Sequence, residues 1–262
     1  MRWHLAIDAA LVLAVPFVAL HWWRTLGRLR AARMTGPSPI PTVGVETLDR
    51  AFAPGPFGPT SDAEVSFVGR ASAEVLGGTS DAESWILAVL AKRARLMFEF
   101  GTCTGKTAYL WARNSSPDAR VVTVTLAPDH LGDYKQEAAD DPLDVQFALK
   151  ESSHTVFLYA DSPVASKVEQ LFADSKALDV SPWAGSCDLV FVDGSHAYSY
   201  VVSDSAKALE LVAPGGLVLW HDYAGPRHAA GVYRALNELA QRLPLVRVEG
   251  TTLVAYRRPA ER

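Results

Sequence analysis

The stretch Leu96–Thr107, LMFEFGTCTGKT, decides the fold. Its apolar first half, together with Arg95, is too short and too apolar for anything but a buried strand. Gly101 and Gly105 then allow backbone angles and close approaches that a side chain would block. The helical pattern of residues 106–114 starts directly after this loop, so its free N–H groups point back at the loop. Such a crevice, at the carboxyl end of a first strand, is where open α/β sheets bind nucleotide-like ligands.

Apolar, β-rich runs alternate with helical patterns along most of the chain. Strands are expected at residues 121–126, 155–160, 188–192 and 217–220, and crossover helices at 164–172, 198–212 and 229–243. This alternation predicts a doubly wound, mostly parallel, Rossmann-like α/β sheet. Residues 245–248 and 252–256 are expected to add a C-terminal antiparallel pair of strands. Upstream of the first strand, Ser80 and Glu83 have capping-box spacing and predict a helix that runs to about residue 93.

The N-terminal residues differ in composition from the rest. Leu5 to Trp23 are mostly apolar and are followed by a cluster of arginines, which predicts a helix that anchors the chain in a membrane with the later residues in the cytoplasm. A cleaved signal peptide and a peripheral amphipathic helix are the competing interpretations. We therefore expect an anchor at residues 1–33, a Pro/Gly-rich linker and lid segment at 34–79, and a catalytic domain at 80–262.

Composition excludes several classes of protein. The chain has 262 residues, of which 49% are hydrophobic, enough for one well-buried domain with an appendage. A formal net charge of -4 gives no general attraction to nucleic acid, so a nucleic-acid partner is not expected. The two cysteines, Cys103 and Cys187, cannot form a disulfide framework, which suits a reduced compartment. The catalytic part is therefore expected in the cytoplasm, with or without the membrane anchor.

Polar side chains follow four of the expected strands. They are Glu99 beside Gly101, Asp161 with Ser162, Asp193 with His196, and His221 with Asp222. Because the carboxyl ends of parallel strands meet at one edge of a sheet, these groups are expected to converge there.

Three runs together resemble the class I S-adenosylmethionine-dependent methyltransferases. They are Glu99–Thr107 (EFGTCTGKT), Asp188–Tyr198 (DLVFVDGSHAY) and Ala213–Tyr223 (APGGLVLWHDY). The resemblance covers roughly residues 80–257. The second and third runs are similar to a branch that includes metal-dependent small-molecule and sugar O-methyltransferases. The resemblance therefore implies S-adenosylmethionine as cofactor and methyl transfer to a hydroxyl of a small-molecule, glycan or lipid-linked acceptor.

The resemblance also assigns residues to the cofactor. Gly101, Thr102 and Gly105 would line its methionine end, and Glu99 would hold its ammonium group, directly or through water. Asp161 and Ser162 would lie near the adenine, and the reactive carbon of the cofactor would face Asp193 and His196. The sequence departs from the family at the second strand, where Thr125 stands in place of the acid that grips the ribose. The loss of a charge-assisted hydrogen-bond pair is expected to weaken cofactor binding.

A divalent metal is the second group that the resemblance implies. In the metal-dependent branch, the acid after the fourth strand and two polar residues after the fifth hold the ion, and here these are Asp193, His221 and Asp222. An imidazole with two carboxylates would admit manganese, iron or zinc more readily than magnesium. His196 and Asp193 would be the catalytic residues, with His196 accepting the acceptor's proton near neutral pH.

Two rival functions remain open on the sequence alone. The glycine loop is close to a nucleotide-binding P-loop, but only three residues separate Gly101 from Gly105, one fewer than the P-loop needs. A membrane-tethered domain that kept the fold but lost turnover is the other rival, suggested by Thr125. The oligomeric state is not encoded in a recognisable pattern, and a homo-oligomer remains an option.

Overall fold

The computed structural model describes residues 38–56, 58–59, 63, 65 and 78–260. The predicted membrane helix at 5–23 and most of the predicted lid at 60–77 lie outside the described residues. Within the described ranges, no helix has both the length and the apolar character that crossing a membrane requires.

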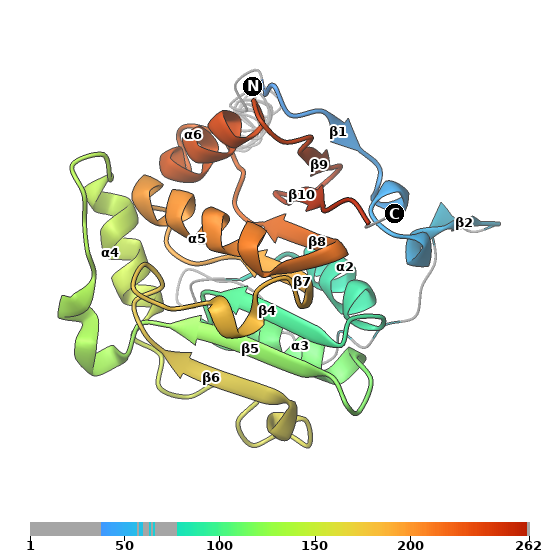
Figure 1. Cartoon of the computed structure of the whole chain (residues 1–262), viewed down its shortest axis with the longest axis horizontal. Helices are drawn as coiled ribbons and strands as arrows, with labels where there is room; N and C mark the ends of the chain where they lie inside the picture. Colours follow the sequence, from blue (N-terminus) through green and yellow to red (C-terminus); the bar gives the residue numbers. More distant parts are fainter. Residues whose placement is uncertain (1–37, 57, 60–62, 64, 66–77, 261–262) are drawn as a thin grey trace, which may run out of the picture.

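Eight strands of the described chain form one twisted sheet (Figure 1). Its order is β1-β9-β10-β8-β7-β4-β5-β6. Five strands run parallel: β8 (Val212–Trp220), β7 (Cys187–Val192), β4 (Leu96–Phe100), β5 (Arg120–Thr125) and β6 (Val168–Phe172). β10 (Val254–Arg257) is antiparallel to both β8 and β9 (Val246–Val248), and β1 (Thr42–Val43) pairs in parallel with β9. The expected Rossmann-like sheet and its C-terminal antiparallel pair are thus confirmed.

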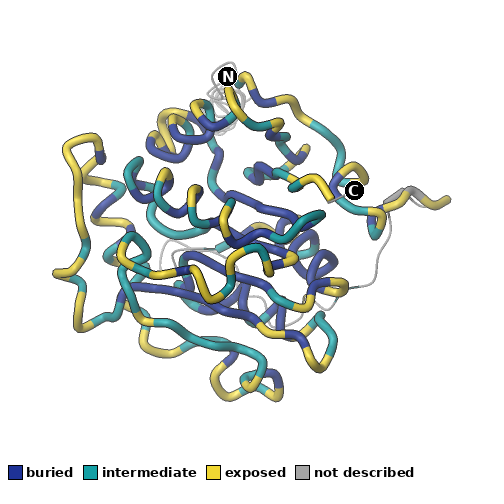
Figure 2. Tube along the Cα trace, in the orientation of Figure 1, coloured by how far each residue is buried: buried dark blue, intermediate teal, exposed yellow. Residues whose placement is uncertain are grey.

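Helices cover both faces of this sheet. Helices α2 (Asp81–Ala91) and α3 (Lys106–Asn114) cover one face and α5 (Tyr198–Leu211) and α6 (Ala230–Leu239) the other, whereas α4 (Pro142–Glu151) lies beyond the ends of the strands (Figure 1). Short 3-10 turns lie at Val45–Thr47, Arg50–Phe52, Pro128–Asp133, Ala165–Lys167 and Ser181–Trp183, and β2 (Pro54–Gly55) pairs with β3 (Gly58–Pro59). Because successive strand residues face opposite sides, Met97 packs in the layer of α2 and α3, and Phe98 packs in the layer of α5 and α6. The central strands are therefore buried on both sides (Figure 2).

The capping box that begins α2 is present as predicted. The Ser80 hydroxyl accepts a hydrogen bond from the Glu83 N–H, and the Glu83 carboxylate accepts one from the Ser80 N–H. Helix α3 has the predicted bounds, 106–114, and begins after Gly105. The sequence therefore predicted closely the bounds of α2 and α3, the helices before and after β4.

The third parallel strand was predicted wrongly. Residues 155–160 form a loop and turns, and the strand is β6, within the range predicted as a helix. Within this loop Tyr159 is buried in the core cluster that contains Trp111 and Phe157 packs against that cluster, whereas Val156 is 77% exposed. Val164, Val168 and Leu171 have the spacing of a helical face, and this spacing misled the prediction. Helix α4 was not predicted at all.

The described part of the Pro/Gly-rich segment packs onto the domain. Ile40, Leu48 and Phe52 are buried, with at most 3% of each exposed, and strand β1 lengthens the sheet. The Arg257 guanidinium contacts the backbone oxygen of Leu48 and lies 3.2 Å from the Asp49 carboxylate. Residues 38–56 are therefore a docked arm rather than a free linker.

Candidate active site at the carboxyl edge of the sheet

Backbone hydrogen bonds continue past the strands and hold the polar residues after them together. The Gly101 N–H donates to the Val124 carbonyl at 2.9 Å, and the Asp193 N–H donates to the Phe100 carbonyl at 2.8 Å. The His221 N–H donates to Val192 at 3.1 Å. Gly101, Asp193 and His221 thus lie side by side, as the sequence predicted.

At Gly101 the glycine loop lies directly against the backbone of Asp193. The φ angle of Gly101 is +101°, and a Cβ atom there would lie 2.0 Å from the Asp193 carbonyl oxygen. Only glycine fits both the angle and the space. Gly105 also has a positive φ, +77°, and a Cβ atom there would meet the Tyr159 ring at 2.8 Å. The two predicted glycines are therefore required by the backbone.

Glu99 is buried behind this loop, with 1% of its surface exposed. The Thr123 hydroxyl donates to its carboxylate at 2.6 Å. Burial raises the pKa of Glu99 to about 8, against the lowering effect of the Thr123 bond, and the negative charge of Asp193 adds to the rise. The side chain of Thr102 bonds to Thr123 and Gln170 instead of facing the loop. Within the described part of the chain, no cation contributes to this pKa shift to favour the charged form of Glu99.

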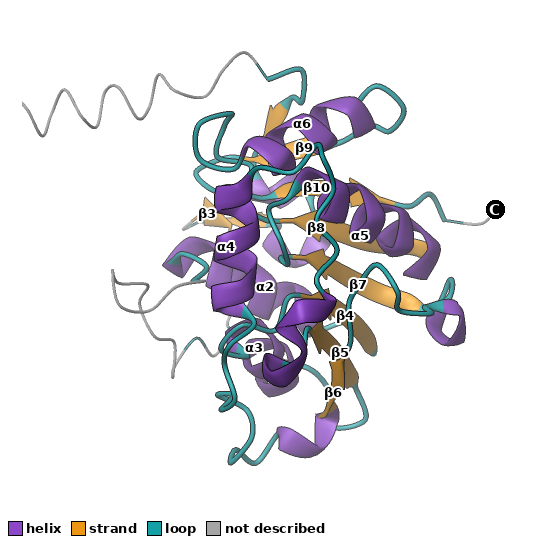
Figure 3. Cartoon of the chain, turned by 90° about the vertical axis from the view of Figure 1, so that its left-hand side faces the viewer, coloured by secondary structure: helices purple, strands orange, loops and turns teal. Residues whose placement is uncertain are grey.

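A pocket lies over these strand ends, with α4 on its outer side. Figure 3 faces this edge of the molecule and shows α4 in front of the strands. The walls of the pocket include Gly101, Thr125, Asp174, Ser175 and Asp193, together with the last turn of α4 and part of α5. Thr125 is therefore placed where the family's ribose-binding acid is expected.

Asp161 and Ser162 do not reach this pocket, contrary to prediction. They precede β6 instead of following it, and they line a separate depression beside Tyr109. The polar pair that follows β6 is Asp174 and Ser175, and it does line the pocket. The error follows directly from the misplaced third strand.

Two carboxylates of the pocket each have one buried oxygen atom without a hydrogen-bond partner in the described part of the chain. Among the described residues, Asp174 Oδ2 and Asp204 Oδ1 have no hydrogen-bond partner. Burial raises the pKa of Asp204 to about 7. Glu151, at the end of α4, also faces the pocket, and burial raises its pKa to about 7. These acids suit a ligand that donates hydrogen bonds or carries positive charge.

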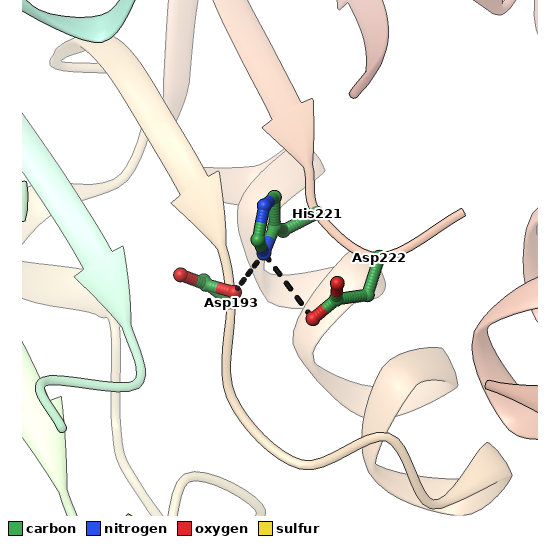
Figure 4. A group of neighbouring side chains, drawn as sticks. All are labelled: Asp193, His221 and Asp222. Atoms are coloured by element: carbon green, nitrogen blue, oxygen red, sulfur yellow. Dashed lines mark hydrogen bonds and ion pairs between the residues drawn. The ribbon is translucent and has the colours of Figure 1, made fainter. Parts of the chain in front are cut away.

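Asp193, His221 and Asp222 form a compact cluster, as predicted (Figure 4). One potential ligand atom from each lies within 4.8 Å of the others. His221 Nδ1 is 2.8 Å from an Asp193 oxygen and 3.2 Å from an Asp222 oxygen. Asp222 has a φ of +57°, an uncommon angle for a side-chain-bearing residue, which often marks a functional position. Sequence reasoning therefore grouped these three residues correctly.

The donor set fits a divalent ion. Burial alone would lower the pKa of His221, but the charges of Asp193 and Asp222 outweigh it and raise the pKa well above the usual value. The cluster therefore favours a positive charge at its centre. Two carboxylates and one imidazole are ligands that manganese, iron and zinc accept. The residues present thus suit such an ion.

His196 contacts this cluster through Asp222, with Nε2 at 2.8 Å from a carboxylate oxygen. Burial would lower its pKa, but the hydrogen bond and charge of Asp222 raise it to about 9. With this partner His196 is mainly protonated at neutral pH. The hydrogen bond makes His196 a partner that orients Asp222, and its role as proton acceptor stays a prediction.

Residues 98–223 match the family model described as a methyltransferase domain. Residues 98–223 are thereby identified as a methyltransferase domain. The match spans the glycine loop, the pocket and the cluster of Asp193, His221 and Asp222, and it ends one residue after Asp222. The rival P-loop interpretation is therefore set aside.

Solved structures share the fold of this methyltransferase domain. SAH-bound methyltransferase PaMTH1 from Podospora anserina is 15% identical, covers 72% of this chain and 83% of its own, and has a TM-score of 0.50. The O-methyltransferase TomG from Streptomyces achromogenes, in complex with SAM, is 24% identical over 70% of this chain and 82% of its own, with a TM-score of 0.49. No curated protein gave a match to the chain.

Three parts of the methyltransferase site escaped sequence reasoning. Glu83 was assigned only to the helix cap, yet its carboxylate also lies 3.3 Å from His221 Nε2. Glu151 belongs to a helix that was not predicted. Asp174 and Ser175 follow β6, whose sequence VEQLF neither alternates nor forms an apolar run, so no clear strand signal pointed to them.

Proposed function

We propose that this protein transfers a methyl group from S-adenosylmethionine to a hydroxyl group of a small polar acceptor, with assistance from a divalent ion. One observation carries the proposal: Asp193 belongs to both the pocket at the strand ends and the metal-ligand cluster. A donor in the pocket and an acceptor at the cluster would meet at this residue. Proximity of this kind accounts for much of the catalysis of a bimolecular transfer.

The pocket supports a role for this chain's own residues toward the cofactor. The ammonium group of the methionine end would supply the positive charge that buried Glu99 lacks. Thr125 would offer the ribose one neutral hydrogen bond. Asp174 and Ser175 replace Asp161 and Ser162 as the residues beside the adenine, and the unpartnered oxygen of Asp174 suits the adenine amino group.

The other side of the cluster supports a polar acceptor. A cleft there is lined, among the described residues, by Gly78–Asp81, Glu83, His221, Asp222 and Thr252. Apart from the glycine, every one of these side chains is polar, which favours a hydroxyl-rich small molecule or glycan over an apolar ring. A divalent ion bound by Asp193, His221 and Asp222 would supply Lewis-acid activation of the acceptor hydroxyl. Asp222, oriented by His196, would help to fix the acceptor's position.

The proposal also includes two features carried by sequence alone. The apolar residues 5–23 and the arginines after them support attachment to a membrane, with the methyltransferase domain on the cytoplasmic side. Assembly as a homo-oligomer is an option that size-exclusion chromatography with light scattering would test. Neither feature enters the chemistry described above.

Calorimetric titration with S-adenosylmethionine and with ATP tests the cofactor. We expect S-adenosylmethionine to bind and ATP to give no heat of binding. Binding of ATP alone would restore the P-loop rival, and binding of neither would indicate a scaffold.

Transfer of a labelled methyl group to a panel of sugars, polyols and phenols tests the reaction. We expect transfer to a polar acceptor that requires manganese or a similar ion and stops with a chelator. Asp193→Ala should abolish it. If the rate of transfer were the same with and without the chelator, the protein would still be a methyltransferase, but the proposed assistance by a metal ion would be wrong.

A further inference from the structure

Glu83 makes more contacts than a helix cap requires. Its side chain is 4% exposed, and one carboxylate oxygen, Oε2, accepts the Ser80 N–H at 2.8 Å, which completes the capping box. The other oxygen, Oε1, accepts both the N–H of Thr252 at 2.7 Å and its hydroxyl at 2.8 Å. A buried carboxylate with this many donors is held in one orientation.

That orientation aims the carboxylate at the back of His221. Glu83 Oε2 lies 3.3 Å from His221 Nε2, within ion-pair distance of a buried nitrogen that has no hydrogen-bond partner among the described residues, whereas Nδ1 faces Asp193 and Asp222 on the other side of the ring. Glu83 is not part of the compact set of ligand atoms. It therefore contacts the nitrogen that an ion bound between Asp193 and Asp222 would leave free.

Thr252 links Glu83 to the second residue of the cluster. The Thr252 hydroxyl donates to Glu83 and accepts the backbone N–H of Asp222 at 3.2 Å. Asp222 has the positive φ angle described above, so its backbone needs such support. One carboxylate from α2 thus reaches both residues that follow β8.

We propose that Glu83 is a positioning residue that keeps the proton of His221 on Nε2 and thereby leaves Nδ1 free to bind the divalent ion. The inference rests on the proposed metal site and goes beyond it. Ligating histidines commonly donate their second N–H to a carboxylate, which fixes the tautomer and the ring orientation, and loss of that partner typically weakens metal binding by about 10–100-fold. Glu83 would be that partner, supplied by a helix that precedes the first parallel strand.

The variant Glu83→Gln tests the charge without removing the cap. Glutamine serves in the same capping position, so helix α2 should form normally. Ser80→Ala is the matched control, because it removes a capping hydroxyl and leaves the contact between Glu83 and His221 in place. Binding of Mn²⁺ is measured on the full chain from the electron paramagnetic resonance signal of the free ion.

We expect Glu83→Gln to weaken Mn²⁺ binding by about 10–100-fold and Ser80→Ala to leave it unchanged. A second readout is the ¹⁵N spectrum of histidine-labelled protein loaded with Zn²⁺. In the wild type, Nε2 of His221 should carry the proton, and in Glu83→Gln this preference should be lost. His221→Asn identifies the resonance.

Three results would overturn the inference. Equal Mn²⁺ affinity in Glu83→Gln and wild type would reject a role of Glu83 toward the ion while leaving the metal site intact. An equal loss in Ser80→Ala would reduce Glu83 to its structural role in the cap. Failure of the wild type to bind Mn²⁺ would remove the metal site and this inference together, whereas binding of S-adenosylmethionine would still stand.

Discussion

Single residues at the carboxyl edge of the sheet are constrained by space as much as by chemistry. Gly101→Ala would drive a Cβ atom into the Asp193 backbone at a φ angle that alanine disfavours. We expect the free energy of unfolding to fall by about 3 kcal/mol or more. Gly132→Ala is the control, because within the described part of the chain no atom lies within 4 Å of the added Cβ. Urea unfolding measures both, and equal stability of the two variants would contradict the role of Gly101.

If Glu99 holds the ammonium group of the cofactor, as we propose, cofactor binding should depend on pH. Its pKa is raised to about 8, so below that pH the free protein holds it protonated, and an ammonium group beside it would favour the carboxylate. Binding should therefore release a proton below pH 8 and release none from Glu99 above it. Calorimetry at about pH 6.5, in buffers of different ionisation enthalpy, counts the protons released. Glu99→Gln should release about one proton fewer than the wild type. The same count in both proteins would place the ammonium group elsewhere.

The same raised pKa has a consequence for stability. The folded protein favours the protonated form of Glu99 more strongly than the unfolded chain does, because in the unfolded chain the pKa of Glu99 has its ordinary value of 4.5. This contribution is complete below the unfolded pKa and is lost as pH rises toward 8. Glu99→Gln should therefore flatten the fall in stability over that range.

At the scale of elements, sequence predicted best where local and tertiary preferences agree. The capping box of α2 and the glycine loop before α3 are encoded by neighbouring residues, and both were predicted closely. β6 is an edge strand whose five residues are all at least partly exposed, so it lacks the apolar run that marks the central strands. The loop at 155–160 has the more apolar sequence, yet only Tyr159 is buried in the core, with Phe157 packed against it. Only the tertiary contacts separate the two cases.

Lys207 contacts the backbone of the segment after β6 at several points. Lys207 on α5 donates to the backbone carbonyls of Lys176 at 3.0 Å and Leu178 at 2.6 Å, and also to that of Ser175, which lines the pocket. Lys207→Met should loosen this segment and weaken S-adenosylmethionine binding by about tenfold, because misplacing one good hydrogen bond costs about that much. Calorimetric titration measures the change.

Lys167→Met is the matched control for that prediction. Lys167 also donates to backbone carbonyls, those of Ala112 and Ser115, but it does so at the far end of α3. The Lys167→Met variant should be less stable than the wild type and keep its affinity for the cofactor. If both variants lost affinity to the same extent, the segment after β6 would have no special role.

At the scale of the whole molecule, the sequence pattern left open how the residues before the catalytic domain pack. Prolines and glycines in residues 34–60 indicated a linker or a loosely docked arm, since both disfavour regular structure. They do not prevent burial of the apolar residues between them: Phe52 is fully buried beside Trp85 on the α2 side of the sheet, with ring centroids 5.1 Å apart. Composition thus describes local backbone preference and misses packing.

If the arm at residues 38–56 is part of the folded unit, removing its anchor must destabilise the whole domain. Phe52→Ala should lower the free energy of unfolding by about 3–5 kcal/mol, the range for deleting a buried aromatic ring. Phe172→Ala removes the same ring from a side chain that is 54% exposed and should change stability by about 0.5 kcal/mol or less. Chemical unfolding followed by tryptophan fluorescence compares the two. A single transition shifted only in Phe52→Ala would place the arm in the cooperative core, whereas an unshifted main transition would mean that the arm detaches while the sheet stays folded.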